Sequence, residues 1–248
     1  MIGILFIGIG EYHKLFADFH RGCNAFFFPD IPKRYFFVSD LDFRQNEHVL
    51  PKDVVGVNVA RCLWPWPTLN RFHYYLELKK IGAFDKISHV FFFNSNCRFL
   101  SLIDNPRFLS AELIATKHPG YFLSERGTYP YESREESAAF VKNSEGRFYL
   151  AGGFQGGRVT ALASAFSHCL KLLHLDMSKS IIAKWHDESY WNRYIIDAQN
   201  NEILDLEIAG PEYLVPVGQR IPLNPKIVIL HKEFIFTEDG RNLQQLKT

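Results

Sequence analysis

The chain has 248 residues, of which 47% are hydrophobic, and a formal net charge of +1. That length can bury a sizeable core, and the near-neutral charge argues against an extended nucleic-acid surface. No apolar run is long enough to span a membrane, and residues 1–4 lack the basic start of a signal peptide, so we expect a cytoplasmic protein with no membrane anchor. The four cysteines have neither C-x-x-C nor zinc-ligand spacing, and we expect reduced thiols.

Hydrophobic patterns in the first half of the chain predict strands that alternate with helices, as in α/β proteins. Four consecutive bulky residues at 90–93 suit a strand that is buried on both faces. The predicted elements, in order, are strand 2–9, helix 12–26, strand 34–38, strand 54–59, helix 68–81 and strand 89–93.

The second half of the chain contains a long polar segment, 124–146, which we interpret as a functional loop. The elements predicted around it are strand 111–116, strand 147–150, helix 159–175, strand 181–185, a helix from Asp187 through Tyr194 and strand 226–230. Without an internal repeat or a convincing linker, we predict one domain over 1–248, ending in a mobile tail over about 231–248.

Two of the predicted strands end in motifs that could bind a ligand, because α/β proteins bind ligands beyond the carboxyl ends of strands. The first strand ends in Gly8-Ile9-Gly10, but His13 stands where a dinucleotide fingerprint needs its third glycine, so we predict no dinucleotide cofactor. Strand 89–93 ends at Asn94-Ser95-Asn96, which is typical of a turn.

Two further segments carry residues suited to a sugar. The run 152–157 holds four glycines in six residues, which indicates either a close approach of the backbone to another group or a turn with left-handed residues. Trp185-His186-Asp187-Glu188 combines a ring that could pack on a sugar with carboxylates that could stabilise an oxocarbenium-like centre. A structurally satisfied buried cluster explains these residues equally well, and Asp187 could simply cap a helix.

Taken together, these motifs resemble the α-1,3-galactosyl/N-acetylgalactosaminyltransferase family that includes the ABO histo-blood-group transferases. The resemblance covers nearly the whole chain. It implies an α/β fold of the GT-A type, in which helices flank a mixed, mostly parallel sheet with a Rossmann-like nucleotide-binding half. It also implies a retaining hexosyltransferase that uses a UDP-sugar donor and the 3-hydroxyl of galactose. The motifs that carry it are the triple-Phe strand with its tip, His118-Pro119-Gly120-Tyr121-Phe122, Gly152-Gly153-Phe154-x-Gly156-Gly157 and Trp185-His186-Asp187-Glu188-Ser189-x-x-Asn192-x-Tyr194.

Residue by residue, the resemblance implies a donor site. Arg71 matches an arginine that reaches the donor, although a solvated surface charge is the default interpretation of this residue. Asp187 would bind the donor sugar, and Lys232 would close over the diphosphate. The full set of donor-binding residues implied is Ile7, Gly8, Ile9, Tyr12, Arg71, Asn94, Ser95, Asn96, Ala151, Gly152, Gly153, Asp187, Lys232 and Arg241.

The resemblance also implies the choice of substrates. Ala151 and Gly153 fall at the two positions that tune the donor, and small residues there leave room for an acetamido group, so the expected donor is UDP-GalNAc. His118 and Trp185 would contact the acceptor, with Fucα1-2Gal as the expected glycan end. Glu188 would be the catalytic carboxylate and would also contact the acceptor. It would either attack the anomeric carbon or stabilise an ion pair.

The departure from the mammalian members lies at the tip of strand 89–93. Those members carry Asp-x-Asp where this chain has Asn94-Ser95-Asn96, and neutral amides lack the charge that Mn²⁺ or Mg²⁺ prefers. Resembling bacterial members share the Asn-x-Asn tip and work without metal, so we expect a soluble bacterial enzyme with no metal cofactor. Cations would neutralise the leaving UDP instead, each contributing on the order of 4 kcal/mol. The candidates are Arg71, Arg98, Lys232 and Arg241.

Three alternatives stay open from the sequence. The chain could be a non-catalytic sugar- or nucleotide-binding module that kept the fold after losing a metal site. It could instead be an α-1,3-galactosyltransferase that uses UDP-Gal. A nucleotidyltransferase shares a similar α/β core but is disfavoured, because the chain lacks a glycine-rich phosphate loop.

Overall fold

A seven-stranded mixed sheet organises the computed structural model, which describes residues 1–44, 50–200 and 205–231. In the sheet order β3-β2-β1-β4-β7-β6-β8, the first four strands are mutually parallel, and β7 is antiparallel to both of its neighbours. The strands are β1 (Ile2–Ile7), β2 (Lys33–Ser39), β3 (Val54–Asn58), β4 (His89–Phe93), β6 (Leu113–Lys117), β7 (Leu150–Arg158) and β8 (Leu206–Ala209).

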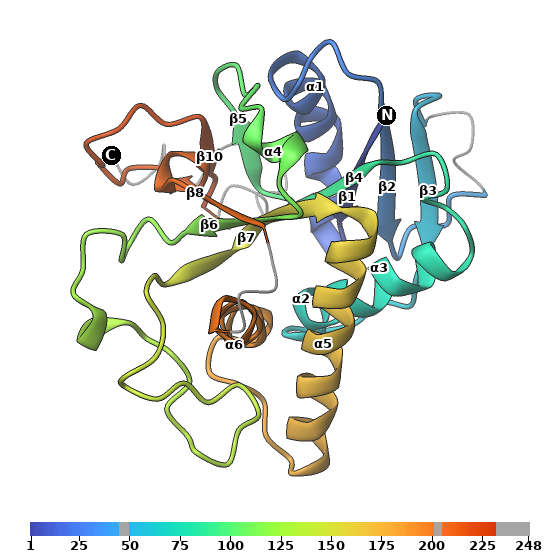
Figure 1. The fold of residues 1–248 in the computed structure, drawn as a ribbon. Coiled ribbons are helices and arrows are strands. Elements are labelled where there is room, and N and C mark those ends of the chain that lie inside the picture. Colours follow the sequence, from blue (N-terminus) through green and yellow to red (C-terminus); the bar gives the residue numbers. More distant parts are fainter. Residues whose placement is uncertain (45–49, 201–204, 232–248) are drawn as a thin grey trace, which may run out of the picture.

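Helices cover both faces of this sheet (Figure 1). α1 lies on one face, and α3, α5 and α6 lie on the other. The α-helices are α1 (Phe16–Phe26), α2 (Trp66–Leu69), α3 (Arg71–Lys80), α4 (Arg107–Ser110), α5 (Val159–Ser178) and α6 (Asp187–Asn200). The 3-10 helices are Gly10–Leu15, Arg126–Thr128 and Pro211–Tyr213, and a small second sheet holds β5 (Cys97–Phe99), β10 (Ile227–Ile229) and β9 (Val215–Pro216). The predicted mixed sheet flanked by helices is confirmed.

The strand β4 is buried on both faces, as its run of bulky residues predicts. Val90 and Phe92 pack into the core beneath α3 and α5, whereas Phe91 and Phe93 pack into the aromatic core on the α1 side. This alternation follows from the two-residue period of a strand. The phenyl ring of Phe93 stacks on that of Phe154 with 4.6 Å between ring centroids, which joins β4 to β7.

The glycine run 152–157 lies inside β7, so the interpretation as a turn is wrong and the interpretation as close approach is the one observed. At Gly156 an added Cβ would lie 2.4 Å from Phe91 Cδ1, so only hydrogen fits against that ring. β7 begins at Leu150, and the predicted strand 147–150 therefore overlaps it at one residue only.

The predicted strand 181–185 is also wrong, because this segment connects α5 to α6 without any strand pairing. Its apolar residues suggested a buried strand, yet the Ile182 and Trp185 side chains are exposed. The loop 124–146 contains a single 3-10 turn and is otherwise irregular, as predicted.

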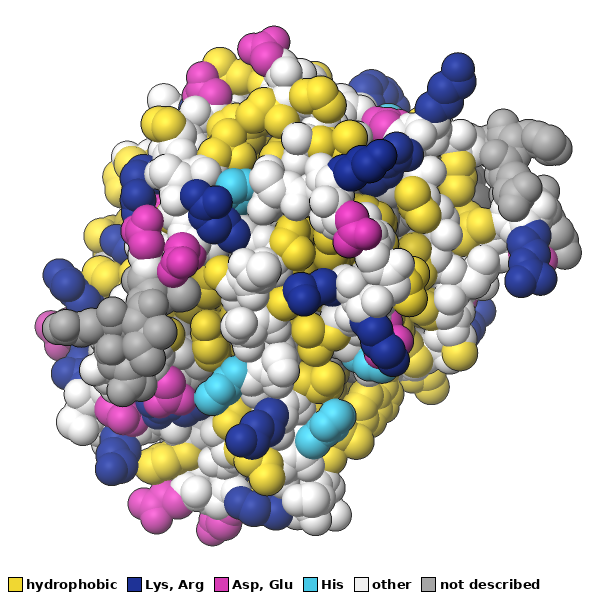
Figure 2. Space-filling view, turned by 45° about the vertical axis from the view of Figure 1, so that its right-hand side comes forward, with side chains coloured by type: hydrophobic (Ala, Val, Ile, Leu, Met, Phe, Trp, Pro, Cys, Tyr) yellow, Lys and Arg dark blue, Asp and Glu magenta, His cyan; other side chains and the backbone are white. Residues whose placement is uncertain are grey.

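The single-domain assignment stays a prediction, and the proposed tail lies outside the described residues beyond His231. The four cysteines are free. Among the described residues, no helix is long and apolar enough to cross a membrane. On the face shown in Figure 2, Lys and Arg side chains are interspersed with Asp and Glu rather than gathered into one patch.

Candidate active site

A cavity of about 420 Å³ opens where β1 and β4 end side by side. Because these strands are parallel, the segments that follow them meet at one edge of the sheet. Seven residues predicted to bind the donor line this cavity: Ile7, Ile9, Tyr12, Arg71, Asn94, Ser95 and Asn96. Gly8 is not among the lining residues, since its main chain is bonded to β2 through Val38 and Ser39.

The two amides of the tip make different contacts. Asn96 is buried, and its Nδ2 donates to the carbonyl of Leu230, while Leu230 N donates back to the Asn96 carbonyl at 2.9 Å. One side-chain N–H of Asn96 is therefore already bonded to the main chain of Leu230. The side chain of Asn94 lies over Gly153, where an added Cβ would stand 2.9 Å from Asn94 Nδ2.

Arg71 is buried between the cavity and the carboxylates of α6, so its interpretation as a solvated surface charge is wrong. The side chain is 2% exposed, and Nη2 pairs with Asp187 Oδ2 at 2.7 Å. Nη1 donates to the carbonyl of Gly152, and the guanidinium carbon lies 3.9 Å from the centroid of the Phe92 ring. Burial lowers the pKa of Arg71, and Asp187 and Glu188 oppose that shift.

Asp187 opens α6 and pairs with Arg71, so its carboxylate has a role other than the helix cap considered from the sequence. Glu188 follows in the same turn and is held at both oxygens. Tyr149 Oη donates to Oε1 at 2.7 Å, and Gly152 N donates to Oε2 at 2.7 Å. Burial raises the pKa of Glu188 to about 7, although these two hydrogen bonds pull it down.

Gly152 is the main-chain link between these groups. Its carbonyl accepts from Arg71, and its N–H donates to Glu188. An added Cβ there would stand 2.8 Å from Asp187 Oδ2. Ala151, one residue earlier, is 5% exposed and packs into the aromatic core.

Of the predicted acceptor residues, His118 packs beside Tyr149. His118 follows β6, and its Nδ1 accepts from Gly120 N at 3.0 Å. Burial lowers the pKa of His118 to about 4, so the ring is neutral at pH 7. The ring centroids of His118 and Tyr149 are 5.6 Å apart. The Trp185 side chain is 45% exposed.

Several residues around this site were not predicted from the sequence. Tyr149 bonds Glu188 directly, and its place beside the glycine run was the one available signal. Asn192 bonds the Leu150 main chain and the Glu188 carbonyl, which fixes α6 on β7; the sequence motif contained this residue without a role. Arg61 adds a cation to the cavity, and no sequence signal pointed to it.

Of the remaining predicted cations, the structure describes only Arg98. Arg98 is an exposed residue of β5 and does not line the cavity. Lys232 and Arg241 lie outside the described residues. Over ranges 1–44, 50–200 and 205–231, no three His, Cys, Asp or Glu are grouped so as to hold a metal ion. The absence of a metal requirement stays a prediction.

Comparison with known proteins locates the chain among glycosyltransferases. Residues 104–235 match the model of glycosyltransferase family 6. An O-antigen biosynthesis glycosyltransferase, WbnI, from Escherichia coli is 34% identical over 194 residues, which are 78% of this chain and 81% of that protein. The mouse globoside alpha-1,3-N-acetylgalactosaminyltransferase 1 is 27% identical over 92% of this chain and 64% of its own length. The rat histo-blood group ABO system transferase 1 is 37% identical over 41% of this chain and 28% of its own length.

Proposed function

The chain belongs to glycosyltransferase family 6, and we propose that it is a metal-independent, retaining α-1,3-N-acetylgalactosaminyltransferase. It is a hexosyltransferase with the GT-A fold of its family, and the family uses a nucleotide-sugar donor and a glycan acceptor. The proposed reaction moves GalNAc from UDP-GalNAc to the 3-hydroxyl of a fucosylated β-galactoside such as Fucα1-2Gal.

One observation carries this proposal: the main chain of Gly152 joins a cavity-lining cation to a half-buried carboxylate. Arg71 reaches the cavity and bonds the Gly152 carbonyl, and the N–H of the same residue holds Glu188. With UDP in the cavity, Arg71 would contact the diphosphate and Glu188 would face the anomeric carbon. The donor sugar would lie between these two side chains. A carboxylate that is held at both oxygens beside this cation favours an enzyme over a binding module.

Two routes through Glu188 are compatible with retention. In the first, the carboxylate bonds to the anomeric carbon as the C1–O bond to UDP breaks, and the acceptor oxygen then displaces the carboxylate. In the second, UDP leaves first, and Glu188 stabilises the cationic sugar until the acceptor oxygen enters on the same face. In both routes the acceptor hydroxyl loses its proton, and the departing phosphate oxygen is a base within reach.

The choice of UDP-GalNAc rests on the small residues Ala151 and Gly153 of the family resemblance. The Asn94 amide lies against Gly153, where an added Cβ would stand 2.9 Å from Nδ2, and that amide could hydrogen bond an acetamido group. Relatives named as N-acetylgalactosaminyltransferases favour the same donor. A human relative named alpha-1,3-galactosyltransferase 2, 33% identical over 84 residues, favours UDP-Gal instead.

The absence of a metal requirement is supported by the chemistry of the tip. Asn94 and Asn96 supply neutral oxygens only, and one N–H of Asn96 is bonded to Leu230. Arg71 and Arg61 line the same cavity. A guanidinium about 4 Å from a phosphate oxygen contributes on the order of 4 kcal/mol at an effective dielectric of 20, and the carboxylates paired with Arg71 and Arg61, Asp187 and Asp40, offset part of this attraction.

A transfer assay with competing donors tests the proposal. The purified protein would receive equimolar UDP-GalNAc and UDP-Gal with a panel of galactosides, with and without α1-2 fucose, and the product linkage would be determined by NMR. We expect α1-3-linked GalNAc on the fucosylated acceptor. Mainly transferred galactose would overturn the donor assignment, and UDP binding without any product on any acceptor would favour the binding module.

A further inference from the structure

The connection of residues 179–186 determines where Trp185 stands and how α6 begins. Because it contains neither helix nor strand, its path depends on the partners of its peptide groups. Three consecutive N–H groups donate to side chains: Ala183 N to Tyr190 Oη at 3.3 Å, Lys184 N to Glu132 Oε2 at 2.7 Å and Trp185 N to Ser189 Oγ at 3.0 Å.

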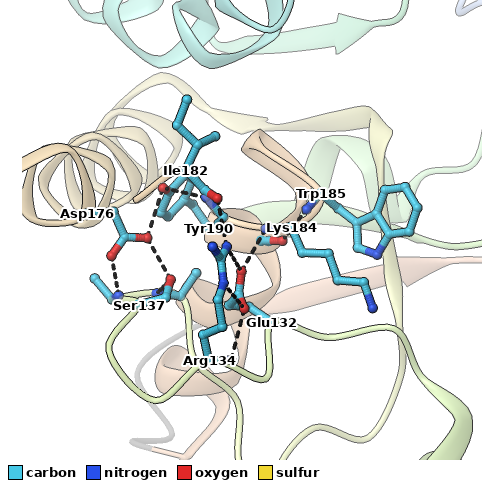
Figure 3. Close-up of polar contacts among 12 residues, drawn as sticks. Glu132, Arg134, Ser137, Asp176, Ile182, Lys184, Trp185 and Tyr190 are labelled. Carbon is cyan, nitrogen blue, oxygen red and sulfur yellow. Dashed lines mark hydrogen bonds and ion pairs between the residues drawn. The ribbon is translucent and has the colours of Figure 1, made fainter. Parts of the chain in front are cut away.

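Two residues of the distant loop 124–146 bond this connection (Figure 3). Glu132 is 2% exposed, and besides Lys184 N its carboxylate accepts from Arg134 Nε at 3.0 Å and Nη2 at 2.6 Å. Arg134 Nη2 also donates to the carbonyl of Ile182 at 2.7 Å. The pair thus holds a main-chain group on each side of Ala183. Figure 3 shows the Trp185 side chain projecting away from this cluster.

The charge on Glu132 strengthens these contacts. Burial raises the pKa of Glu132, but the hydrogen bonds from Arg134 and Lys184 outweigh it and bring the pKa to about 2. The carboxylate is therefore ionised throughout the neutral range, and hydrogen bonds to a charged acceptor are stronger than neutral ones. Without it, Lys184 N would lose its acceptor.

A second anchor keeps the loop attached independently of Glu132. Asp176, at the end of α5, accepts from Ser137 Oγ at 2.6 Å, from Ala138 N and from Tyr190 Oη at 3.0 Å. These bonds join the loop, α5 and α6 (Figure 3). A change at Glu132 therefore leaves the loop docked while it frees the Lys184 N–H, next to Trp185.

We propose that Glu132, together with Arg134, is a positioning residue that sets Trp185 for the acceptor glycan. This inference rests on the proposed function, in which Trp185 contacts the acceptor galactose. Glu188 has its own bonds to Tyr149 and Gly152, so the donor chemistry is separated from this cluster. The proposal therefore predicts that a substitution at Glu132 weakens acceptor binding more than it slows the cleavage of the donor.

Kinetics of Glu132→Ala and Glu132→Gln test this separation, with Glu135→Gln as the control. Glu135 is an exposed carboxylate of the same loop, so its variant makes the same charge change away from the connection. We expect Glu132→Ala to raise the acceptor KM about 10-fold or more, in line with the loss of a charged hydrogen bond. Glu132→Gln keeps an acceptor for Lys184 N and should recover part of that loss.

Hydrolysis of the donor by water, measured without acceptor, reports donor chemistry alone. A purely structural role of Glu132 would impair this hydrolysis together with acceptor use. Hydrolysis rate and UDP affinity should stay within about 2-fold of the parent enzyme, since a change of that size is under 0.5 kcal/mol. An unchanged acceptor KM in Glu132→Ala, or a parallel fall in hydrolysis, UDP binding and acceptor use, would overturn the proposal.

Arg134→Gln provides a second variant with little risk to folding, because the Arg134 side chain is 48% exposed. It should raise the acceptor KM, and the double variant Glu132→Gln/Arg134→Gln should be no worse than the more affected single, since the two residues act as one unit. The assays use whichever donor and acceptor the parent enzyme accepts. Failure of the proposed function would appear in the parent enzyme, whereas failure of this inference appears only in the variants.

Discussion

At the residue scale, Gly152 determines how close the carboxylates of α6 come to the sheet. The neighbouring groups leave no space for a side chain, since Asp187 Oδ2 would lie 2.8 Å and Glu188 Cβ 3.4 Å from an added Cβ. Sequence could indicate that a backbone comes close to something here. Sequence could not identify Asp187 and Glu188 as the neighbouring residues, because they lie in α6, which begins only after α5 has ended.

We predict that Gly152→Ala lowers kcat by about 10-fold or more while UDP binding changes little. The methyl group would displace the Asp187 carboxylate from Arg71 and shift Glu188, and misplacement of a catalytic group by fractions of an ångström is costly. Steady-state kinetics and UDP titration measure this. Gly127→Ala is the control, because no atom lies within 4 Å of the added methyl. Equal kcat in both variants would contradict the assignment of Glu188.

Tyr149→Phe should move the acid limb of the kcat/KM pH profile to higher pH. Glu188 must be ionised to act on the anomeric carbon, so activity rises as pH increases through its pKa of about 7. Burial raises that pKa, the Tyr149 hydrogen bond lowers it, and loss of the bond therefore raises it further. Arg71 and Asp187 also face Glu188 and are unchanged in the variant.

Tyr129→Phe is the matched control for this profile. Its ring packs 6.3 Å from that of Tyr149 between centroids, and Glu188 takes its hydroxyl bond from Tyr149. The Tyr129 variant should keep the parent profile. If the acid limb of the kcat/KM profile of Tyr149→Phe coincided with that of the parent enzyme, the role given to Glu188 would be contradicted.

At the scale of elements, most helices and strands were predicted because their hydrophobic periods are clear. β4 is an example, since Phe91 and Phe93 face one core while Val90 and Phe92 face the other. Residues 181–185 of the connection 179–186 were mistaken for a strand, because a short run of apolar residues is typical of a buried strand as well as of an irregular connection. The connection is bonded through side chains of the loop and of α6, and such partners leave no local pattern.

Arg71 shows the same limit within a correctly predicted helix. The sequence places it on a face of α3 with Tyr75, and both side chains prove to be buried. A buried arginine requires an acidic partner. That partner, Asp187, lies in α6 and could be paired with Arg71 only through the family resemblance, because spacing carries no information over such a separation.

Two glycine substitutions test the packing of β7 and of α1 independently. Gly156→Ala should lower the free energy of unfolding by roughly 1–3 kcal/mol, because its methyl would overlap the Phe91 ring in a filled core. Gly22→Ala should raise it by roughly 0.5–1 kcal/mol, since α1 gains helix propensity and the methyl meets Phe99 at 3.5 Å. Urea denaturation measures both, and effects of equal sign would contradict the described packing.

At the scale of the whole molecule, the sheet order brings the ends of β1 and β4 together and places β7 and α6 beside them. The cavity, the Arg71–Asp187 pair and the Glu188 carboxylate therefore form one continuous site. The fold class was predictable from sequence because strands and helices alternate. Motif resemblance named seven of the residues that line the cavity, whereas Arg61, Tyr149 and the contacts among these residues required the structure.

The central claim is that cations of the protein, rather than a bound metal, neutralise the leaving UDP at the Asn94-Ser95-Asn96 tip. The most direct test measures initial rates of GalNAc transfer from UDP-GalNAc after exhaustive EDTA treatment, and again with added Mn²⁺ or Mg²⁺. We expect the transfer rates in EDTA and with added metal to lie within about 2-fold of each other, because neutral amides add little affinity for a hard cation. Loss of transfer in EDTA with recovery on adding Mn²⁺ would contradict this claim.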